Sequence, residues 1–311
     1  MNMKTVYLNK FMSSVVAELE MNGQYGTAHV CGSVLRSVMA FDGEGLPVSG
    51  ITPLWLKAYE GYLLHKGGKG LAWNTVSTYM RMLQAVYNRA VVRKLAAFIP
   101  HQFRDVFTGR KADHRRVLER DDMQKLLVER DPDITSPGMA WARACLELMF
   151  RFHGMPFVDL AHLRKSDLKD GYLTLRRRKT GMPLSARVDG RAMQLLERYR
   201  NRDDTSPYLL CFLDGNLEGM AAYRDYQRIL RLLNSRLRAL ALWKKVQGKV
   251  TSYSARHTWA TVGRYCHIPI EVISEGLGHA SVTTTEGYMK GFGNSRMDRA
   301  NKVIMNYIFK G

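Results

Sequence analysis

Long apolar runs are missing from this sequence. No stretch approaches the roughly 18 consecutive apolar residues that a membrane-spanning helix requires. The first residues, MNMKTVYLNKFMSS, also lack the apolar core of a secretory signal. We therefore expect a cytoplasmic protein without a membrane role.

Cysteine is scarce and scattered. The four cysteines, Cys31, Cys145, Cys211 and Cys266, show no CxxC spacing. Their distribution excludes the usual zinc-cluster patterns and a disulfide framework, and it fits a reducing compartment. We expect no metal site and no cofactor.

Acidic residues are few relative to basic ones. The chain has 28 Asp and Glu against 47 Lys and Arg, which gives a formal net charge of +19 and a pI near 9.9. Such a surplus attracts polyanions, and double-stranded DNA is the leading candidate partner. The alternative is a generally basic surface without a specific partner. A membrane-surface role would call for an amphipathic basic helix or a lipidation motif, and the sequence has neither.

Strand patterns are rare as well. Only GYLTLRRRKTGMPLSARV, residues 171–188, alternates with period two, which predicts two strands joined at Lys179, Thr180 and Gly181. Nearly everything else carries helical spacing. The sequence thus predicts a mainly α protein of two domains, one all-α and one mostly helical with a small antiparallel β-sheet.

Breaks in the helical pattern indicate the domain boundaries. Residues 1–100 read as four helices separated by Gly-rich turns, with Thr52 and Pro53 starting the third helix and Asn74 or Thr75 capping the fourth. The polar, basic segment 101–117 reads as a linker. A second domain over 118–293 and a short C-terminal amphipathic helix with a tail over 294–311 complete the chain.

Basic residues of the later helices in the first domain are candidates for DNA contacts. They could follow a phosphate backbone along one face of that domain. The candidates are Lys66, Lys69, Arg81, Arg89 and Arg93.

Three short segments of the second domain carry residues suited to phosphate chemistry. TSYSARHTWAT (251–261) contains Arg256, LGHASVTTTEGYM (277–289) contains His279 and Tyr288, and RRRKTG (176–181) contains Lys179. Each segment is weak alone. Tyr288 could be an ordinary helix tyrosine, Arg256 a surface ion pair, and 269–289 a non-catalytic helix-turn-helix. The order Lys, Arg, His, Tyr at these spacings is more specific.

In that order and spacing the sequence resembles the tyrosine recombinase (phage integrase) family over essentially its whole length. ARHTWAT looks like the family's second arginine box, LGHASVTTTEGYM like its histidine box and nucleophilic tyrosine, and KTG like its catalytic lysine on a hairpin. The resemblance implies a helical core-binding domain, a linker and a catalytic domain with one small sheet.

The resemblance also implies a mechanism. Tyr288 would attack the scissile phosphate to give a 3′-phosphotyrosine, which stores the phosphodiester bond energy without ATP. Arg256 would stabilise the phosphate charge, His279 would donate a hydrogen bond or assist proton transfer, and Lys179 would protonate the leaving 5′-oxygen. Neighbouring Arg176, Arg177 and Arg178 would form a DNA-facing basic strand. No metal is required.

Two positions depart from the family pattern. The second box usually begins with histidine, and Tyr253 stands there instead. The first arginine usually lies two residues past a turn glycine, and Pro156 stands there. Tyr253 can still donate a hydrogen bond to phosphate. We expect Arg151, or less readily His153, to replace the first arginine.

The predicted function is therefore a site-specific DNA recombinase, acting in DNA inversion or in integration and excision of a mobile element. The alternatives are a DNA-binding regulator that does not cleave and a type IB topoisomerase-like enzyme that relaxes DNA. The resemblance implies a homotetramer on paired DNA sites, assembled from monomers, with accessory DNA-bending proteins as possible partners. The 294–311 tail would dock on a neighbouring protomer.

Overall fold

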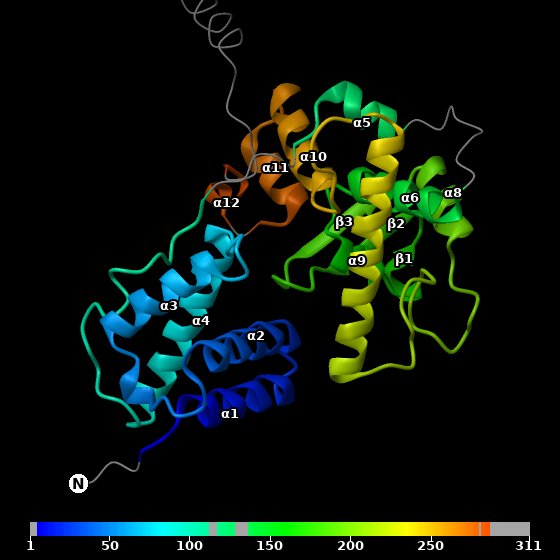
Figure 1. The fold of residues 1–311 in the computed structure, drawn as a ribbon. Helices are drawn as coiled ribbons and strands as arrows, with labels where there is room; N and C mark the ends of the chain where they lie inside the picture. The colour runs from blue at the N-terminus through cyan, green and yellow to red at the C-terminus, as the bar shows by residue number, and fades with distance from the viewer. Residues whose placement is uncertain (1–4, 112–116, 128–135, 280, 287–311) are drawn as a thin grey trace, which may run out of the picture. The chain divides into compact units, whose positions relative to one another are not determined.

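The computed structural model describes residues 5–111, 117–127, 136–279 and 281–286 (Figure 1). Tyr288 and the 294–311 tail lie outside the described residues. The chain divides into two compact units, of which the first comprises Met1–Ala112 with Glu218–Tyr223 and the second Asp113–Leu217 with Arg224–Gly311. Each unit is described by itself.

Four helices build the first unit, as the sequence predicts. Helix α2 contacts the other three, and α3 also contacts α4. The apolar face of each helix closes on one core that includes Met12, Val34, Tyr59 and Met80. The helices are α1 (Leu8–Met21), α2 (Tyr25–Asp42), α3 (Pro53–His65) and α4 (Trp73–Val92), with a 3-10 turn, η1 (Val48–Gly50), before α3.

The two predicted helix starts in this unit have different outcomes. The Thr52 hydroxyl accepts the backbone N–H of Trp55 at 3.2 Å, which confirms the cap of α3. The prediction for α4 is wrong, because this helix begins after Ala72 without a side-chain cap. The Asn74 amide instead binds the backbone of Lys111, donating to its carbonyl and accepting its N–H, both at 2.8 Å.

Residues 101–111, the first part of the predicted linker, pack on the first unit. Phe103 and Val106 are buried in its core. The buried Glu60 carboxylate accepts the backbone N–H of Phe107 at 2.7 Å, and the Ser77 hydroxyl donates to the Gly109 carbonyl at 2.6 Å. Buried polar groups of α3 and α4 therefore fix this polar segment, although its lack of periodicity indicates a linker.

The second unit combines helices with one small sheet. The sheet has the order β1-β2-β3, and its strands are antiparallel, with Thr174 opposite Ser185. The predicted hairpin is therefore confirmed. The elements are α5 (Arg120–Leu127), α6 (Pro137–Arg151), α7 (Phe157–Ala161), η2 (Lys165–Asp167), β1 (Leu168–Lys169), β2 (Tyr172–Arg176), β3 (Pro183–Arg187), α8 (Gly190–Arg198), α9 (Gly219–Trp243), α10 (Ser254–Tyr265), α11 (Ile270–Leu277) and α12 (Val282–Glu286).

Helix α6 lies at the centre of this unit. It contacts α5, α7, α8 and α10, and most of its residues are buried. The core around it includes Leu146, Phe152, Leu173 and Leu237. Because α6 is packed on several sides, the turn that follows it, residues 152–156, has a fixed position against α10.

The mainly α fold with one small antiparallel sheet agrees with the sequence-based prediction. In the described part of the chain, no helix has both the length and the apolar character needed to cross a bilayer.

Candidate active site

Arg256 lies in the first turn of α10 and is held by two backbone carbonyls. Its side chain is buried, with the residue only 4% exposed. One terminal nitrogen, Nη1, donates to the Gly154 carbonyl at 3.0 Å, and Nη2 donates to the Leu277 carbonyl at 2.7 Å. A planar guanidinium held at both ends has one orientation, which is what recognition of a phosphate in fixed geometry requires.

The first of these carbonyls depends on glycine. Gly154 has a φ of +66°, and a Cβ placed there would lie 2.9 Å from the Arg256 Cα. A side chain at this position would push α10 away from the turn after α6. The glycine of HGMP thus brings a backbone carbonyl into contact with the arginine, which explains its place in the motif.

His279 lies directly after α11, beside the Arg256 guanidinium. Gly278 ends the helix in the left-handed conformation, with φ +61°, and turns the chain so that His279 Nε2 lies 2.7 Å from Arg256 Nη2. A guanidinium only donates, so Nε2 accepts this hydrogen bond. Burial, and then the positive charges of Arg256, Arg177 and Lys179, lower the pKa of His279 to about 4.

Arg177 departs from the expectation that Arg176, Arg177 and Arg178 form a DNA-facing basic strand. This residue is 6% exposed. Its Nε donates to Asp159 Oδ2 at 2.6 Å, and its Nη1 donates to the same Leu277 carbonyl that binds Arg256. Arg176 and Arg178, by contrast, are exposed. Arg177 is therefore a second buried guanidinium of the site.

A signal in the sequence could have identified Arg177. Side chains of a strand alternate between two faces, and Leu173 on β2 is a core residue. Continuing the alternation through Leu175 places residue 177 on the core side and leaves 176 and 178 outside. The burial pattern of the structure follows this rule. The run of three arginines conceals the pattern because its members have identical side chains.

Asp159 on α7 fixes Arg177. This carboxylate is 2% exposed, and its second oxygen, Oδ1, accepts the backbone N–H of Arg178 at 2.9 Å. Asp159 and Arg177 thus form a buried ion pair. Counting Arg256, Arg177 and Lys179 against this one carboxylate leaves the site with an excess of positive charge, which favours an anionic ligand.

The α11 carbonyl of Leu277 joins the two arginines. Helix C-termini carry partial negative charge, and cations beside them are stabilised. Here the last residue of α11 accepts hydrogen bonds from Arg256 and Arg177 together. The two guanidinium groups, from α10 and from the end of β2, therefore meet next to His279.

Lys179 lies at the tip of the β2–β3 hairpin, as predicted. The Arg177 carbonyl accepts the N–H of Gly181 at 2.8 Å, and the Arg177 N–H donates to the Met182 carbonyl at 2.9 Å, which closes the turn. Lys179 is exposed, and its charge contributes to the lowered pKa of His279. An exposed ammonium on a short turn can approach a group bound beside the two arginines.

Tyr253 is the N-cap residue of α10. It is 40% exposed, and its ring lies 6.2 Å from that of His257. It belongs to the same turn as Arg256. Tyr288, the predicted nucleophile, lies outside the described residues.

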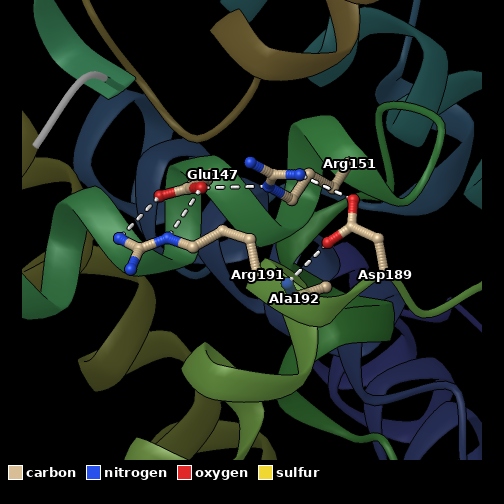
Figure 2. Close-up of polar contacts among 5 residues, drawn as sticks. All are labelled: Glu147, Arg151, Asp189, Arg191 and Ala192. Carbon is tan, nitrogen blue, oxygen red and sulfur yellow. Dashed lines mark hydrogen bonds and ion pairs between the residues drawn. The ribbon is translucent and has the colours of Figure 1, made fainter.

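Arg151 is placed differently from the expectation that it replaces the first arginine. Its Nε donates to Glu147 at 2.9 Å and its Nη1 to Asp189 at 2.6 Å (Figure 2). Glu147 is also paired with Arg191, and Asp189 caps α8 through the Ala192 N–H. The Arg151 guanidinium is thus held by two carboxylates in a network that joins α6 to α8, and the structure does not group it with Arg256 and His279.

The predicted DNA-binding residues of the first unit lie on α4 and in the turns that follow α3 and α4. Arg89 and Arg93 both pair with Glu18, at 3.3 and 2.7 Å. Lys66 contacts Ser37 and the Tyr62 ring, Arg81 donates to the Ser77 carbonyl, and Lys69 is exposed. Their contact with DNA stays a prediction.

Two family models match this sequence. Residues 7–104 match a phage integrase SAM-like domain, and residues 116–292 match the phage integrase family. Among curated proteins, the tyrosine recombinase XerA of Pyrococcus furiosus is 29% identical over 140 residues, or 44% of this chain and 46% of that protein. The match thus spans about half the length of that relative.

Solved structures show a similar fold. A lambda integrase (75-356) dimer bound to a COC' core site has a TM-score of 0.66 at 18% identity, covering 93% of this chain and 97% of that one. The Tn1549 transposon integrase in complex with a circular intermediate DNA has a TM-score of 0.63 at 15% identity, covering 95% of this chain and 100% of that one. At these identities the likeness establishes the fold alone.

Proposed function

Because the chain belongs to the phage integrase family, we propose that it is a site-specific DNA recombinase that cuts and rejoins strands through a 3′-phosphotyrosine at Tyr288. The observation that carries this function is the meeting of two buried guanidinium groups, Arg256 and Arg177, at one carbonyl beside His279. Such a site suits a phosphodiester, whose nonbridging oxygens accept hydrogen bonds from planar forks.

Each group has a role in this chemistry. Arg256 and Arg177 bind the nonbridging oxygens and stabilise the charge that develops as Tyr288 attacks. His279 assists from the same side with a hydrogen bond to phosphate. Tyr288 releases its phenolic proton to solvent as its oxygen bonds to the 3′-phosphate, and Lys179 protonates the 5′-oxygen as the bond between that oxygen and phosphorus breaks.

We infer that Arg177, and not Arg151, supplies the guanidinium missing at Pro156. Arg177 shares the Leu277 carbonyl with Arg256, whereas Arg151 binds Glu147 and Asp189. Arg177, at the end of β2, thus supplies the positive charge that an arginine at position 156 would provide. Tyr253, in the turn of Arg256, donates a further hydrogen bond to the phosphate.

The remaining features belong to the same proposal. The 1–100 domain, with residues 101–111 packed on it, and the 118–293 domain both bind duplex DNA. Four protomers assemble on two paired sites from free monomers, and the 294–311 tail docks on a neighbour. The reaction needs neither metal nor cofactor. The outcome is inversion or integration and excision, depending on where the two sites lie.

A nicked suicide substrate tests the cleavage step. On such a DNA the short 5′-hydroxyl fragment diffuses away, so the covalent protein–DNA adduct accumulates and is seen by denaturing electrophoresis. The wild-type protein is expected to form the adduct, and Tyr288→Phe to form none while still binding the site. A wild-type protein that binds tightly without forming an adduct would instead be a non-cleaving regulator.

A matched pair of variants tests the role of Arg177 in the same assay. Arg177→Lys keeps the charge beside Asp159 but loses the planar fork, so adduct formation is expected to slow by about 100-fold, as when one donor of a charge-stabilising site is removed. Arg178→Lys keeps the charge with which this exposed neighbour would attract DNA, so its rate should stay within about threefold of wild type. Equal rates for the two variants would show that Arg177 does not bind the phosphate.

A further inference from the structure

Thr285 is the buried residue of α12, and its hydroxyl contacts His279. The side chain is inaccessible to solvent, whereas Thr283 and Thr284 of the same short helix are exposed. Thr285 Oγ1 lies 2.8 Å from His279 Nδ1. The threonine therefore reaches the ring nitrogen opposite the one that faces Arg256.

The proton positions follow from the two contacts of the ring. Arg256 Nη2 can only donate, so His279 Nε2 accepts. In the neutral ring the proton then resides on Nδ1, and the Thr285 oxygen accepts it. The Arg256 contact thus selects the Nδ1–H tautomer, and the Thr285 oxygen holds the proton that this tautomer carries.

We propose that Thr285 is a positioning residue for strand cleavage, which holds Nδ1–H of His279 so that Nε2 points at the phosphate-binding arginine. When a phosphate oxygen takes over the Arg256 Nη2 hydrogen bond, His279 can take up a proton from solvent at Nε2 and donate this N–H as a hydrogen bond to the phosphate without turning its ring. Thr285 accepts from Nδ1–H in the neutral ring and in the imidazolium alike. This role rests on the proposed recombinase chemistry.

The charges around the ring explain why an anchor is needed. Among the described residues, the charged groups that shift the pKa of His279 are Arg256 from α10, and Arg177 and Lys179 from the β2–β3 hairpin, all of them positive. These cations and burial lower the pKa of the ring, so protonation at Nε2 requires the anion. A ring without a partner at Nδ1 could turn about its last torsion and point the wrong nitrogen at the phosphate.

Three substitutions on α12 test the role. Thr285→Val removes the hydroxyl with little change of shape, Thr285→Ser keeps it, and Thr284→Val makes the same change at an exposed neighbour. Single-turnover adduct formation on the nicked substrate is expected to slow by about 10- to 100-fold in Thr285→Val, as part of the 10²–10⁴-fold that a positioned acid–base group supplies. Thr285→Ser should recover most of the rate, and Thr284→Val should match the wild type.

Three outcomes of these rates would overturn the assignment. One is a Thr285→Val protein as fast as the wild type, and another is a serine variant as slow as valine, which would point to the methyl group. The third is a slower Thr285→Val whose pH–rate profile is unchanged and whose DNA binding falls in proportion, because that pattern indicates structural damage alone. For Thr285→Val we expect the part of the pH–rate profile that reports His279 to shift in pH, while DNA binding stays unchanged.

A spectroscopic measurement tests the positioning role of Thr285 independently of the proposed recombinase activity. Nitrogen-15 shifts of labelled histidine distinguish the two neutral tautomers, and the His279 signals are those lost in His279→Asn. The wild-type protein should show the Nδ1–H form at pH 7, and Thr285→Val a mixture. An unchanged tautomer in Thr285→Val would refute the positioning role. A wild-type protein that forms no adduct would refute the recombinase proposal. The nitrogen-15 measurement would then still test whether Thr285 fixes the tautomer of His279.

Discussion

At the scale of single residues, His279 links the charge of the site to pH. Its pKa falls from 6.5 to about 4 in the folded protein, with burial as the largest cause and three cations adding to it. The unfolded chain therefore binds a proton between these two values while the native state does not. Stability from this residue is fully present above about pH 6.5 and is lost as pH falls toward 4.

This sign gives a testable difference. The wild type is expected to lose stability relative to His279→Gln as pH drops from 7.5 to 4.5, by on the order of 1–3 kcal/mol for a half-buried ring. Urea denaturation at each pH measures it. Because all other titrating groups are common to both proteins, their effects cancel. A wild type that instead gains stability relative to His279→Gln on acidification would contradict the lowered pKa of His279.

The sequence predicts candidate site residues well where they occur in motifs of diagnostic spacing. It does not decide between two arginines that could both fill the same role. Arg256, His279 and Lys179 follow from short motifs, and the structure places them near each other. The choice between Arg151 and Arg177 depends on which carboxylate each one meets. Glu147 and Asp159 lie 4 and 18 positions away from their partners in the chain, and only the fold brings Asp159 to Arg177.

At the scale of elements, the end of α11 has a steric requirement. Gly278 has φ +61°, and a Cβ there would lie 2.7 Å from Arg177 Nη1. Gly181 in the hairpin turn has φ +69°, and a Cβ placed there would meet no atom within 4 Å. The two glycines thus share a backbone conformation and differ in what surrounds them.

Alanine substitutions at Gly181 and Gly278 distinguish the cost of the left-handed backbone from the cost of a steric clash with Arg177. Gly181→Ala is expected to cost about 1–2 kcal/mol of unfolding free energy for its left-handed backbone alone. Gly278→Ala should cost more and also slow adduct formation, because Arg177 must move. Urea denaturation and the nicked-substrate assay measure the two effects. Equal losses in both variants would show that Arg177 does not pack against Gly278.

Elements were predictable from periodicity when they were long. The helices of the first unit and the β2–β3 hairpin have patterns of several repeats. Strand β1 has two residues and α7 has five, which is too short for a pattern, so tertiary contacts define both. Asn74 shows the limit of local rules, since a good capping residue near a helix start binds Lys111, 37 residues away.

At the scale of the whole molecule, net charge would govern the proposed encounter with DNA. A protein with a formal charge of +19 that binds DNA would gain affinity by releasing counterions, so we expect its binding to weaken with salt. The logarithm of the binding constant should fall linearly with the logarithm of salt concentration, with a slope of roughly −0.9 per phosphate neutralised. A response that is flat in salt would refute the phosphate-backbone interface.

Two basic residues of the first unit should contribute unequally to this slope. Lys69 is exposed, and no carboxylate of the described residues pairs with it, whereas Arg93 is bound to Glu18 at 2.7 Å. Lys69→Gln is expected to reduce the slope by about 1 if it contacts a phosphate. Arg93→Gln should change the slope less, because Glu18 already offsets its charge. Fluorescence anisotropy titrations of a labelled duplex at several salt concentrations measure both slopes. A slope that Arg93→Gln reduces more than Lys69→Gln would place the phosphate contact near α1 and the end of α4 instead.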